Sequence, residues 1–138
     1  MLDQATLRRL WNRWPKIGHE IAGRADCPND IWEQAAAGEH RPGRRSAAGR
    51  LTNSTAQLNR FAEDEDQNVR CTAFSHHNAS CALLYRAPLS DIVSLDIRSD
   101  QLEHLDEDTI ERMIGLAHSW SGTLGELREA AALLDVTA

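Results

Sequence analysis

Apolar positions near the start of the chain recur at the spacing of an α-helix. One face of this segment carries Leu7, Leu10, Trp11 and Trp14. The opposite face carries Arg8, Arg9, Arg13 and Lys16. Pro15 is expected to end the helix near Trp14, because proline lacks a backbone donor and restricts the residue before it. Asp3 suits the N-cap position. We therefore predict one helix between Asp3 and Trp14, and a shorter one over about 16–23.

The last third of the chain predicts two more amphipathic helices. The first covers 106–119, where Asp108 and Glu111 have the spacing of a capping box. Its apolar face carries Ile110, Met113, Ile114 and Ala117. In the second helix Thr123 and Glu126 have the same capping spacing. Its apolar stripe carries Leu124, Leu127, Ala131 and Leu134. Between these helices and the middle of the chain, alternating apolar residues over 91–97 predict a short extended piece.

The middle of the chain repeats itself. Segments 20–32, 46–58 and 71–83 align with offsets of 26 and 25 residues. The aligned positions hold Ala22 with Ala48 and Ala73, Gly23-Arg24 with Gly49-Arg50, Asn53 with Asn78, and Trp32 with Leu58 and Leu83. A period of this length is typical of stacked-repeat architectures.

Each repeated unit has a local physical logic. A short helix with a small residue is followed by a polar break, and the break caps a second short helix. Ser54 and Gln57 have the spacing of a capping box at such a break. Arg45 and Arg70 stand immediately before the aligned segments. Their recurrence indicates a structural role, which we predict to be an ion pair with an acidic turn such as EDED at 63–66.

The repeated region resembles the variant leucine-rich repeat, a short helical repeat similar in style to HEAT and armadillo units. The resemblance covers about 16–92 and is best in the stretch LTNSTAQLNRFAEDEDQNVRCTAFSHHNASCALLYRAPLSD. The matching positions are Asn53, Thr55, Leu58, Phe61, Ala62, Asp64, Asp66, Val69, Arg70, Ala73, Asn78, Ser80, Leu83 and Leu84. The resemblance implies a curved right-handed stack of short helices. It implies a scaffolding role without shared catalytic residues.

These patterns together predict an all-α fold. We expect one domain over 1–138, since 138 residues suit a single hydrophobic core. It would be a short right-handed stack of helical repeats over about 16–44, 45–69 and 70–94. A two-helix C-terminal cap over 99–138 would cover the open end, because terminal units of such stacks are atypical.

Charge is unevenly spread along the chain. Residues 1–60 hold ten Arg and Lys against six Asp and Glu, whereas residues 61–138 hold five Arg against fifteen Asp and Glu. The basic half could therefore bind an anion or nucleic acid, or pair head to tail with the acidic half of another copy. The candidate anion-binding residues are Arg8, Arg9, Arg13, Arg41, Arg44, Arg45 and Arg50. The competing interpretation is that the tryptophans beside them belong to the core and the arginines are solvated.

Four reactive side chains cluster in the third repeated segment: Cys71, His76, His77 and Cys81. Zinc prefers four N or S ligands, often as close pairs, and C-x4-H-H-x3-C has no standard pair. The alignment sets these residues opposite Ser46, Leu51, Thr52 and Ala56, which are ordinary helix and turn positions. A metal site and a Cys–His nucleophilic pair stay open as alternatives. No Gly-rich phosphate loop is present, and we predict no cofactor.

The sequence therefore favours a non-enzymatic protein-interaction module, a small adaptor or regulator with a protein partner. Its three cysteines have no framework spacing, and no apolar run is long enough to span a bilayer, so we expect a cytoplasmic location without a membrane partner. The open end near residues 1–15 suits self-association. The first alternative is a nucleic-acid-binding protein that uses the basic half. The second is a small metal protein or enzyme built on the Cys/His cluster.

Overall fold

The computed structural model describes residues 3–14, 18–92 and 106–137. These residues form helices and turns without a β-strand, which confirms the predicted all-α class. The chain divides into two compact units, Met1–Asn78 (unit 1) and Ala79–Ala138 (unit 2). The boundary lies inside the third predicted repeat, 70–94. No helix of the described residues is long and apolar enough to cross a membrane.

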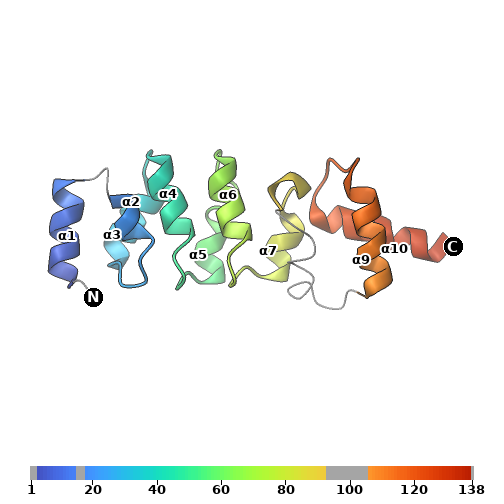
Figure 1. Ribbon diagram of the computed structural model, residues 1–138, viewed down its shortest axis with the longest axis horizontal. Coiled ribbons are helices and arrows are strands. Elements are labelled where there is room, and N and C mark those ends of the chain that lie inside the picture. Colours follow the sequence, from blue (N-terminus) through green and yellow to red (C-terminus); the bar gives the residue numbers. More distant parts are fainter. Residues whose placement is uncertain (1–2, 15–17, 93–105, 138) are drawn as a thin grey trace. The chain divides into compact units, whose positions relative to one another are not determined.

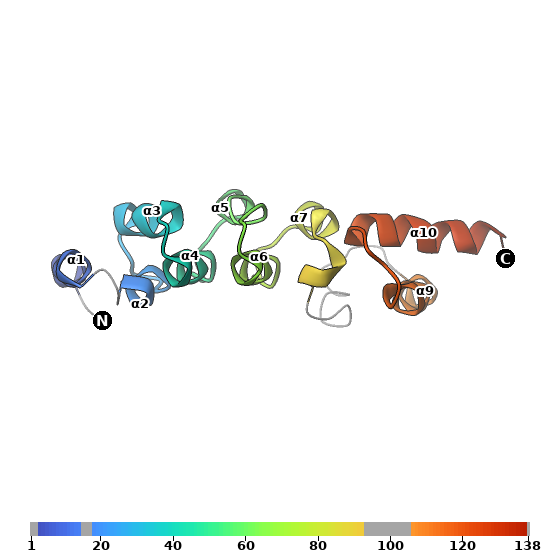
Figure 2. The same cartoon turned by 90° about the horizontal axis from the view of Figure 1, so that it is seen from above.

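Unit 1 arranges its short helices in two layers. The helices are α1 (Gln4–Arg13), α2 (Gly18–Ala22), α3 (Asn29–Ala37), α4 (Arg41–Ala48), α5 (Thr55–Asn59) and α6 (Gln67–Phe74) (Figure 1). In one layer α2 packs against α4, and α4 packs against α6 (Figure 2). In the other layer α3 lies on α4, and α5 lies on α6. The middle helix α4 therefore contacts α2, α3 and α6.

Local capping explains where several helices of unit 1 begin and end. The Asp3 carboxylate accepts the Thr6 N–H at 2.7 Å, and Trp14 is the C-cap of α1. The Ser54 hydroxyl accepts the Gln57 N–H at 3.2 Å, while the Gln57 side chain accepts the Ser54 N–H at 2.8 Å. Side chains that satisfy the first backbone donors of a helix stabilise its start. The predicted N-cap, helix end and capping box are confirmed.

Trp32 is the centre of the core of unit 1, with 1% of its surface exposed. Its indole N–H donates to the Ala47 carbonyl oxygen at 2.9 Å, so α3 is tied to the end of α4. Phe61 meets it edge to face at 5.9 Å between ring centroids. The guanidinium groups of Arg50 and Arg60 lie 4.8 Å and 5.2 Å from the ring centroid. The aligned residues Leu58 and Leu83 are buried as well.

The interpretation that both tryptophans near the start of the chain belong to the core is wrong. Trp11 is half-buried, and its indole N–H donates to Gln34 Oε1 at 2.7 Å. Trp14 is 49% exposed. The reason is that α1 ends at Arg13, so the side chain of Trp14 leaves the helical face that carries Leu7.

Two aligned glycines lie where neighbouring helices approach. A Cβ on Gly23 would lie 3.4 Å from the Ser46 carbonyl oxygen of α4. A Cβ on Gly49 would lie 3.4 Å from Thr72 Cγ2 of α6. At this distance a methyl group would already be in van der Waals contact with the neighbouring helix, so a larger side chain would push the helices apart. The same position of two aligned segments thus performs the same packing task.

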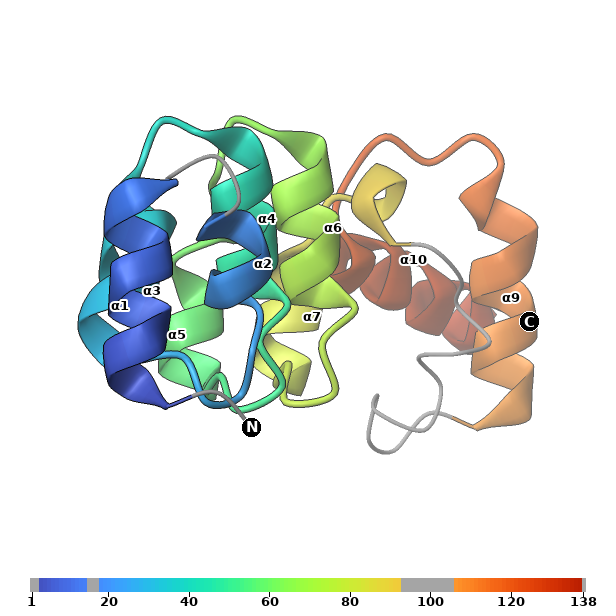
Figure 3. The same cartoon turned by 60° about the vertical axis from the view of Figure 1, so that its left-hand side comes forward.

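Unit 2 contains α7 (Cys81–Arg86), the 3-10 turn η2 (Leu89–Asp91), α9 (Glu107–Ala117) and α10 (Leu124–Thr137). Helix α10 packs against α7 and α9, and it crosses α9 at a steep angle (Figure 3). The Leu124 N–H donates to Ala87 O at 2.9 Å, and the Leu89 N–H donates to Gly122 O at 3.0 Å. These bonds join the segment after α7 to the start of α10.

The C-terminal helices confirm one predicted cap and correct another. Thr123 and Glu126 form their predicted box, since the Thr123 hydroxyl accepts the Glu126 N–H at 3.2 Å and the Glu126 carboxylate accepts the Thr123 N–H at 3.0 Å. The predicted box at Asp108 is wrong, because Asp106 is the N-cap of α9 and accepts the Thr109 N–H at 2.7 Å. The chain enters this helix before Asp108, so that residue lies within the first turn.

The predicted apolar faces of these helices are partly wrong. Leu124, Leu127 and Ala131 are buried, as predicted. Leu134 is 47% exposed and Ile114 is 41% exposed. The C-terminal end of α10 extends past α9, so its last turns lie outside the packed part of the unit (Figure 2). Of the extended piece predicted over 91–97, residues 93–97 lie outside the described residues, and Asp91 ends η2.

Candidate interaction groove between α4 and α6

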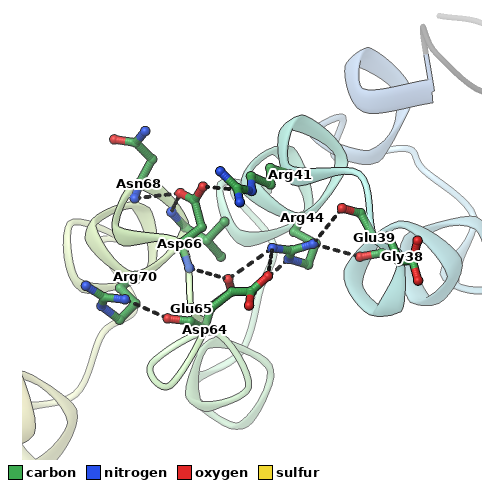
Figure 4. A network of polar contacts seen from close by, with 10 residues as sticks. Gly38, Glu39, Arg41, Arg44, Asp64, Glu65, Asp66, Asn68 and Arg70 are labelled. Carbon is green, nitrogen blue, oxygen red and sulfur yellow. Dashed lines mark hydrogen bonds and ion pairs between the residues drawn. The ribbon is translucent and has the colours of Figure 1, made fainter.

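The acidic turn before α6 holds a buried ion pair. Arg44 of α4 donates to Asp64 twice, from Nε to Oδ2 at 2.9 Å and from Nη2 to Oδ1 at 3.2 Å (Figure 4). Its remaining nitrogen, Nη1, donates to the Gly38 and Glu39 carbonyl oxygens, both at 3.0 Å. The two side chains are only 10% and 11% exposed. Arg44 therefore joins the turn before α4 to the turn before α6.

The electrostatics of this pair follow from its geometry. Burial by itself raises the pKa of Asp64, but the hydrogen bonds from Arg44 and from the Asp66 N–H outweigh it, so the net pKa lies below the ordinary value. The pKa of Arg44 is raised by its hydrogen bonds to Asp64. Both groups are held in their charged forms, as expected for a bidentate guanidinium–carboxylate pair.

The sequence predicts this ion-pairing role for Arg45 and Arg70, and the prediction is wrong for Arg45. Arg44 holds the carboxylate, while Arg45 is exposed. Successive helical residues differ by about 100° in direction, so only one of the two arginines can face the turn. Arg70 does contact the acidic turn, but through the backbone: its Nη1 donates to the Asp64 carbonyl oxygen at 2.7 Å.

Asp66 is the N-cap of α6 and borders a groove between α4 and α6. Its Oδ1 accepts the backbone N–H groups of Asn68 at 2.8 Å and Val69 at 3.3 Å. Its Oδ2 lies 3.7 Å from Arg41 Nε, which is beyond hydrogen-bond distance. The Arg41 side chain is 69% exposed. The Asp66 hydrogen bonds are thus made within its own helix, and its long ion pair with Arg41 leaves that guanidinium group largely in solvent.

A groove of 680 Å³ runs between α4 and α6. It is lined by Arg41, Pro42, Arg45 and Ser46 from α4, and by Asp66, Asn68 and Thr72 at the start of α6. Two exposed arginines therefore lie on one wall, and uncharged polar side chains lie mainly on the other. This arrangement can receive a carboxylate-bearing segment in contact with both helices.

The seven candidate anion-binding arginines do not form one site. Arg44 is in the ion pair, and Arg8 pairs with Asp30. Arg50 is 4% exposed, and its Nε donates to Asn53 Oδ1 at 3.1 Å. Burial lowers the pKa of Arg50, which is the cost of holding a guanidinium in the core.

The other four arginines are exposed: Arg9, Arg13, Arg41 and Arg45. Arg9 and Arg13 belong to α1, where Arg13 lies 5.0 Å from the Trp14 ring centroid. Only Arg41 and Arg45 come together in the groove.

The two histidines of the Cys/His cluster make structural contacts. His76 is 6% exposed, its Nε2 lies 2.7 Å from the Arg50 carbonyl oxygen, and its Nδ1 accepts the Asn78 N–H at 3.0 Å. Both ring nitrogens are therefore engaged by backbone. The exposed His77 stacks on it at 4.6 Å between centroids.

The cysteines of the cluster belong to different units. Cys71 lies in α6 of unit 1, and Cys81 begins α7 of unit 2. Over 3–14, 18–92 and 106–137, no three His, Cys, Asp or Glu side chains are grouped so that they could hold a metal ion. The third cysteine, Cys27, is buried, and burial raises the pKa of its thiol. A raised pKa reduces the fraction of reactive thiolate.

Comparison with known proteins adds no relative. No protein-family model matches the chain, and no curated protein or solved structure matches it either. The functional argument therefore depends on the groove and its chemistry.

Sequence reasoning did not identify the uncharged side of the groove. Ser46, Asn68 and Thr72 are ordinary polar residues in the sequence, and nothing marks them before α4 and α6 are known to be neighbours. One feature of the sequence does point to the groove, namely two pairs of polar residues that are each four residues, or about one helical turn, apart. These pairs are Arg41 with Arg45 and Asn68 with Thr72. Two such pairs on adjacent helices line a common groove.

Proposed function

We propose that this chain is a non-enzymatic, cytoplasmic protein-interaction module, a small adaptor or regulator built from helical repeats of the variant leucine-rich type. The groove between α4 and α6 is its binding surface. Repeat stacks present extended surfaces of this kind to other macromolecules. The partner we propose is a protein.

Recurrent packing supports the repeat interpretation. The aligned glycines, Gly23 and Gly49, occupy matching close approaches to the next helix of the same layer. Helices α2, α4 and α6 follow one another in that layer, and α3 and α5 occupy the second (Figure 2). Equivalent sequence positions with equivalent contacts are what a repeat architecture requires.

The main support for the proposed function is a contrast between polar side chains that are hydrogen-bonded inside unit 1 and polar side chains that are exposed in the groove. Arg44, Arg50 and His76 are buried and hydrogen-bonded within unit 1. Arg41 and Arg45 are exposed and line a groove of 680 Å³. A surface that groups exposed guanidinium groups beside uncharged donors suits recognition of another protein, because a guanidinium group pairs with carboxylates in a defined geometry.

Asn68→Tyr tests the proposed function by filling the groove. Asn68 is exposed on α6, so the larger side chain projects into the groove without disturbing the core. The matched control is Glu63→Tyr, an exposed position that does not line the groove. Tagged wild-type protein and both variants are expressed in the native host, and co-purified proteins are quantified by mass spectrometry.

A partner that uses the groove should be retained by wild type and by Glu63→Tyr. The amount of this partner that co-purifies should fall by about tenfold or more with Asn68→Tyr, which corresponds to a loss of about 1.4 kcal/mol of binding free energy. Far-UV circular dichroism checks that both variants keep the wild-type helix content. The proposed function is contradicted if Asn68→Tyr and Glu63→Tyr retain the same proteins in the same amounts.

A further inference from the structure

The two walls of the groove have the same spacing along their helices. Arg41 and Arg45 are four residues apart on α4, and Asn68 and Thr72 are four residues apart on α6. Four residues of α-helix rise by about 6 Å. Each wall therefore presents two polar groups about 6 Å apart along the groove.

An extended peptide matches this spacing. Its residues rise by about 3.3 Å each and its side chains alternate, so every second side chain points the same way at about 6.6 Å intervals. Two carboxylates separated by one residue would therefore meet Arg41 and Arg45 in turn. We propose that the groove binds an extended segment of a partner protein in which acidic and uncharged residues alternate; this inference rests on the proposed function.

The basic wall is available for such a ligand. The Arg41 side chain is 69% exposed, and its ion pair with Asp66 has an Nε–Oδ2 distance of 3.7 Å, which is too long for a hydrogen bond, so its N–H groups can still donate to a ligand. Arg45 is exposed, and within the described residues no ion pair engages it. Each guanidinium can form a forked pair with a carboxylate, the strongest common type of side-chain hydrogen bond.

The opposite wall suits the peptide backbone. The Thr72 hydroxyl donates to the Asn68 carbonyl oxygen at 2.7 Å, so its oxygen is left to accept a hydrogen bond. The side-chain amide of Asn68 points away from the Asp66 carboxylate (Figure 4). It can donate to a carbonyl oxygen and accept from an N–H group, which is the pattern that a peptide backbone offers.

The acidic rim of the groove favours a peptide over a nucleic-acid strand. Asp66 lines the groove, and the neighbouring Glu65 is 82% exposed. Unit 1 as a whole is close to neutral, with eleven Arg and Lys against ten Asp and Glu. A nucleic-acid strand carries charge on every nucleotide and its affinity depends on many phosphate contacts. An alternating peptide can place its uncharged residues opposite Asp66.

The test uses fluorescein-labelled synthetic probes and the full-length protein. The first peptide alternates Glu and Thr, and the second has the same composition with its Glu residues contiguous. Oligo(dT) represents a single nucleic-acid strand. Binding is measured by fluorescence anisotropy for wild type, Arg45→Gln and Arg9→Gln. Arg9 is an exposed arginine on α1 that does not line the groove, so it controls for the loss of one positive charge.

The alternating peptide should bind more tightly than the contiguous one. Arg45→Gln should weaken the affinity for the alternating peptide by about tenfold, since a charge-assisted hydrogen bond is lost. Arg9→Gln should change this affinity by less than about twofold. Equal affinity for the two peptides overturns the inference, as does equal loss in the two variants. Tighter binding of oligo(dT) than of either peptide also overturns it. A concentration-dependent dimer that Arg45→Gln abolishes would overturn it in favour of a second copy of this chain.

A random peptide library displayed on phage distinguishes the inference from the proposed function. Selected peptides that lose binding with Asn68→Tyr but lack alternating acidic residues would overturn the inference and leave the proposed function standing. If the library yields no binder and the alternating peptide fails as well, both are overturned.

Discussion

Asp64→Asn should destabilise unit 1 far more than the same chemical change at the adjacent residue. The substitution keeps the size and turn-forming character of the side chain but removes its charge and half of its accepting capacity. Arg44 is only 10% exposed and would lose its carboxylate partner. The matched control is Glu65→Gln, because Glu65 also faces Arg44, at 3.8 Å, but is 82% exposed.

The expected magnitude follows from the burial of the pair. Breaking a buried ion pair on one side typically costs about 3–5 kcal/mol. Arg44 keeps its bonds to the Gly38 and Glu39 carbonyl oxygens, so we expect a smaller loss of about 2 kcal/mol. Glu65→Gln should cost less than about 0.5 kcal/mol, as is typical of an exposed pair.

Urea unfolding followed by far-UV circular dichroism measures both losses, with the free energy of unfolding obtained by linear extrapolation. Asp64 has a lowered folded-state pKa, so its stabilising contribution is present above the unfolded-state pKa of about 3.9 and is lost as the pH falls through the folded-state value. The gap between wild type and Asp64→Asn should therefore be full near neutral pH and shrink below about pH 3.9. Equal losses for Asp64→Asn and Glu65→Gln at neutral pH would refute the reasoning.

Four further substitutions probe the packing and the capping, with stability measured by thermal and urea unfolding. Gly125→Ala should cost about 1–3 kcal/mol of stability, because its Cβ would lie 2.9 Å from the Tyr85 carbonyl oxygen. Gly115→Ala should instead stabilise α9 by about 0.5–1 kcal/mol, because a Cβ there would meet nothing within 4 Å. Equal effects of the two substitutions would contradict the packing of α10 on α7. Trp32→Phe removes an indole N–H that donates at 2.9 Å and should cost about 2 kcal/mol, and a neutral result would contradict the buried bond. Ser54→Ala removes an N-cap and should cost about 1 kcal/mol, and an unchanged midpoint would contradict the capping box.

The parts of the fold that could be predicted from the sequence are those governed by local interactions. Asp3, Ser54 and Thr123 were identified as caps because a cap depends on residues within one turn of the chain. The predicted range 106–119 places the start of α9 correctly, but the capping residue is misassigned because Asp106 and Asp108 both offer a carboxylate near the helix start, and the sequence does not distinguish them. Leu134 was misassigned because periodicity marks a face without showing whether a neighbour covers it.

The groove could not be predicted because it depends on which helices are neighbours. Arg44 and Arg45 are identical in type and adjacent, and their different roles follow only from the rotation of α4 against the acidic turn. Likewise, the sequence leaves His76 open as a metal ligand because its residue type is reactive. Its actual contacts, with the Arg50 carbonyl oxygen and the Asn78 N–H, come from turns on either side of it.

The Ala47 carbonyl oxygen near the end of α4 accepts two side-chain donors, the indole of Trp32 at 2.9 Å and the amide of Asn53 at 2.7 Å. One donor precedes the helix and the other follows it, while Arg44 ties its first half to Asp64. A helix of eight residues does not persist alone in water. Its formation must therefore coincide with that of its neighbours, so unit 1 should open in a single cooperative step, and amide exchange in α4 should report the free energy of global unfolding.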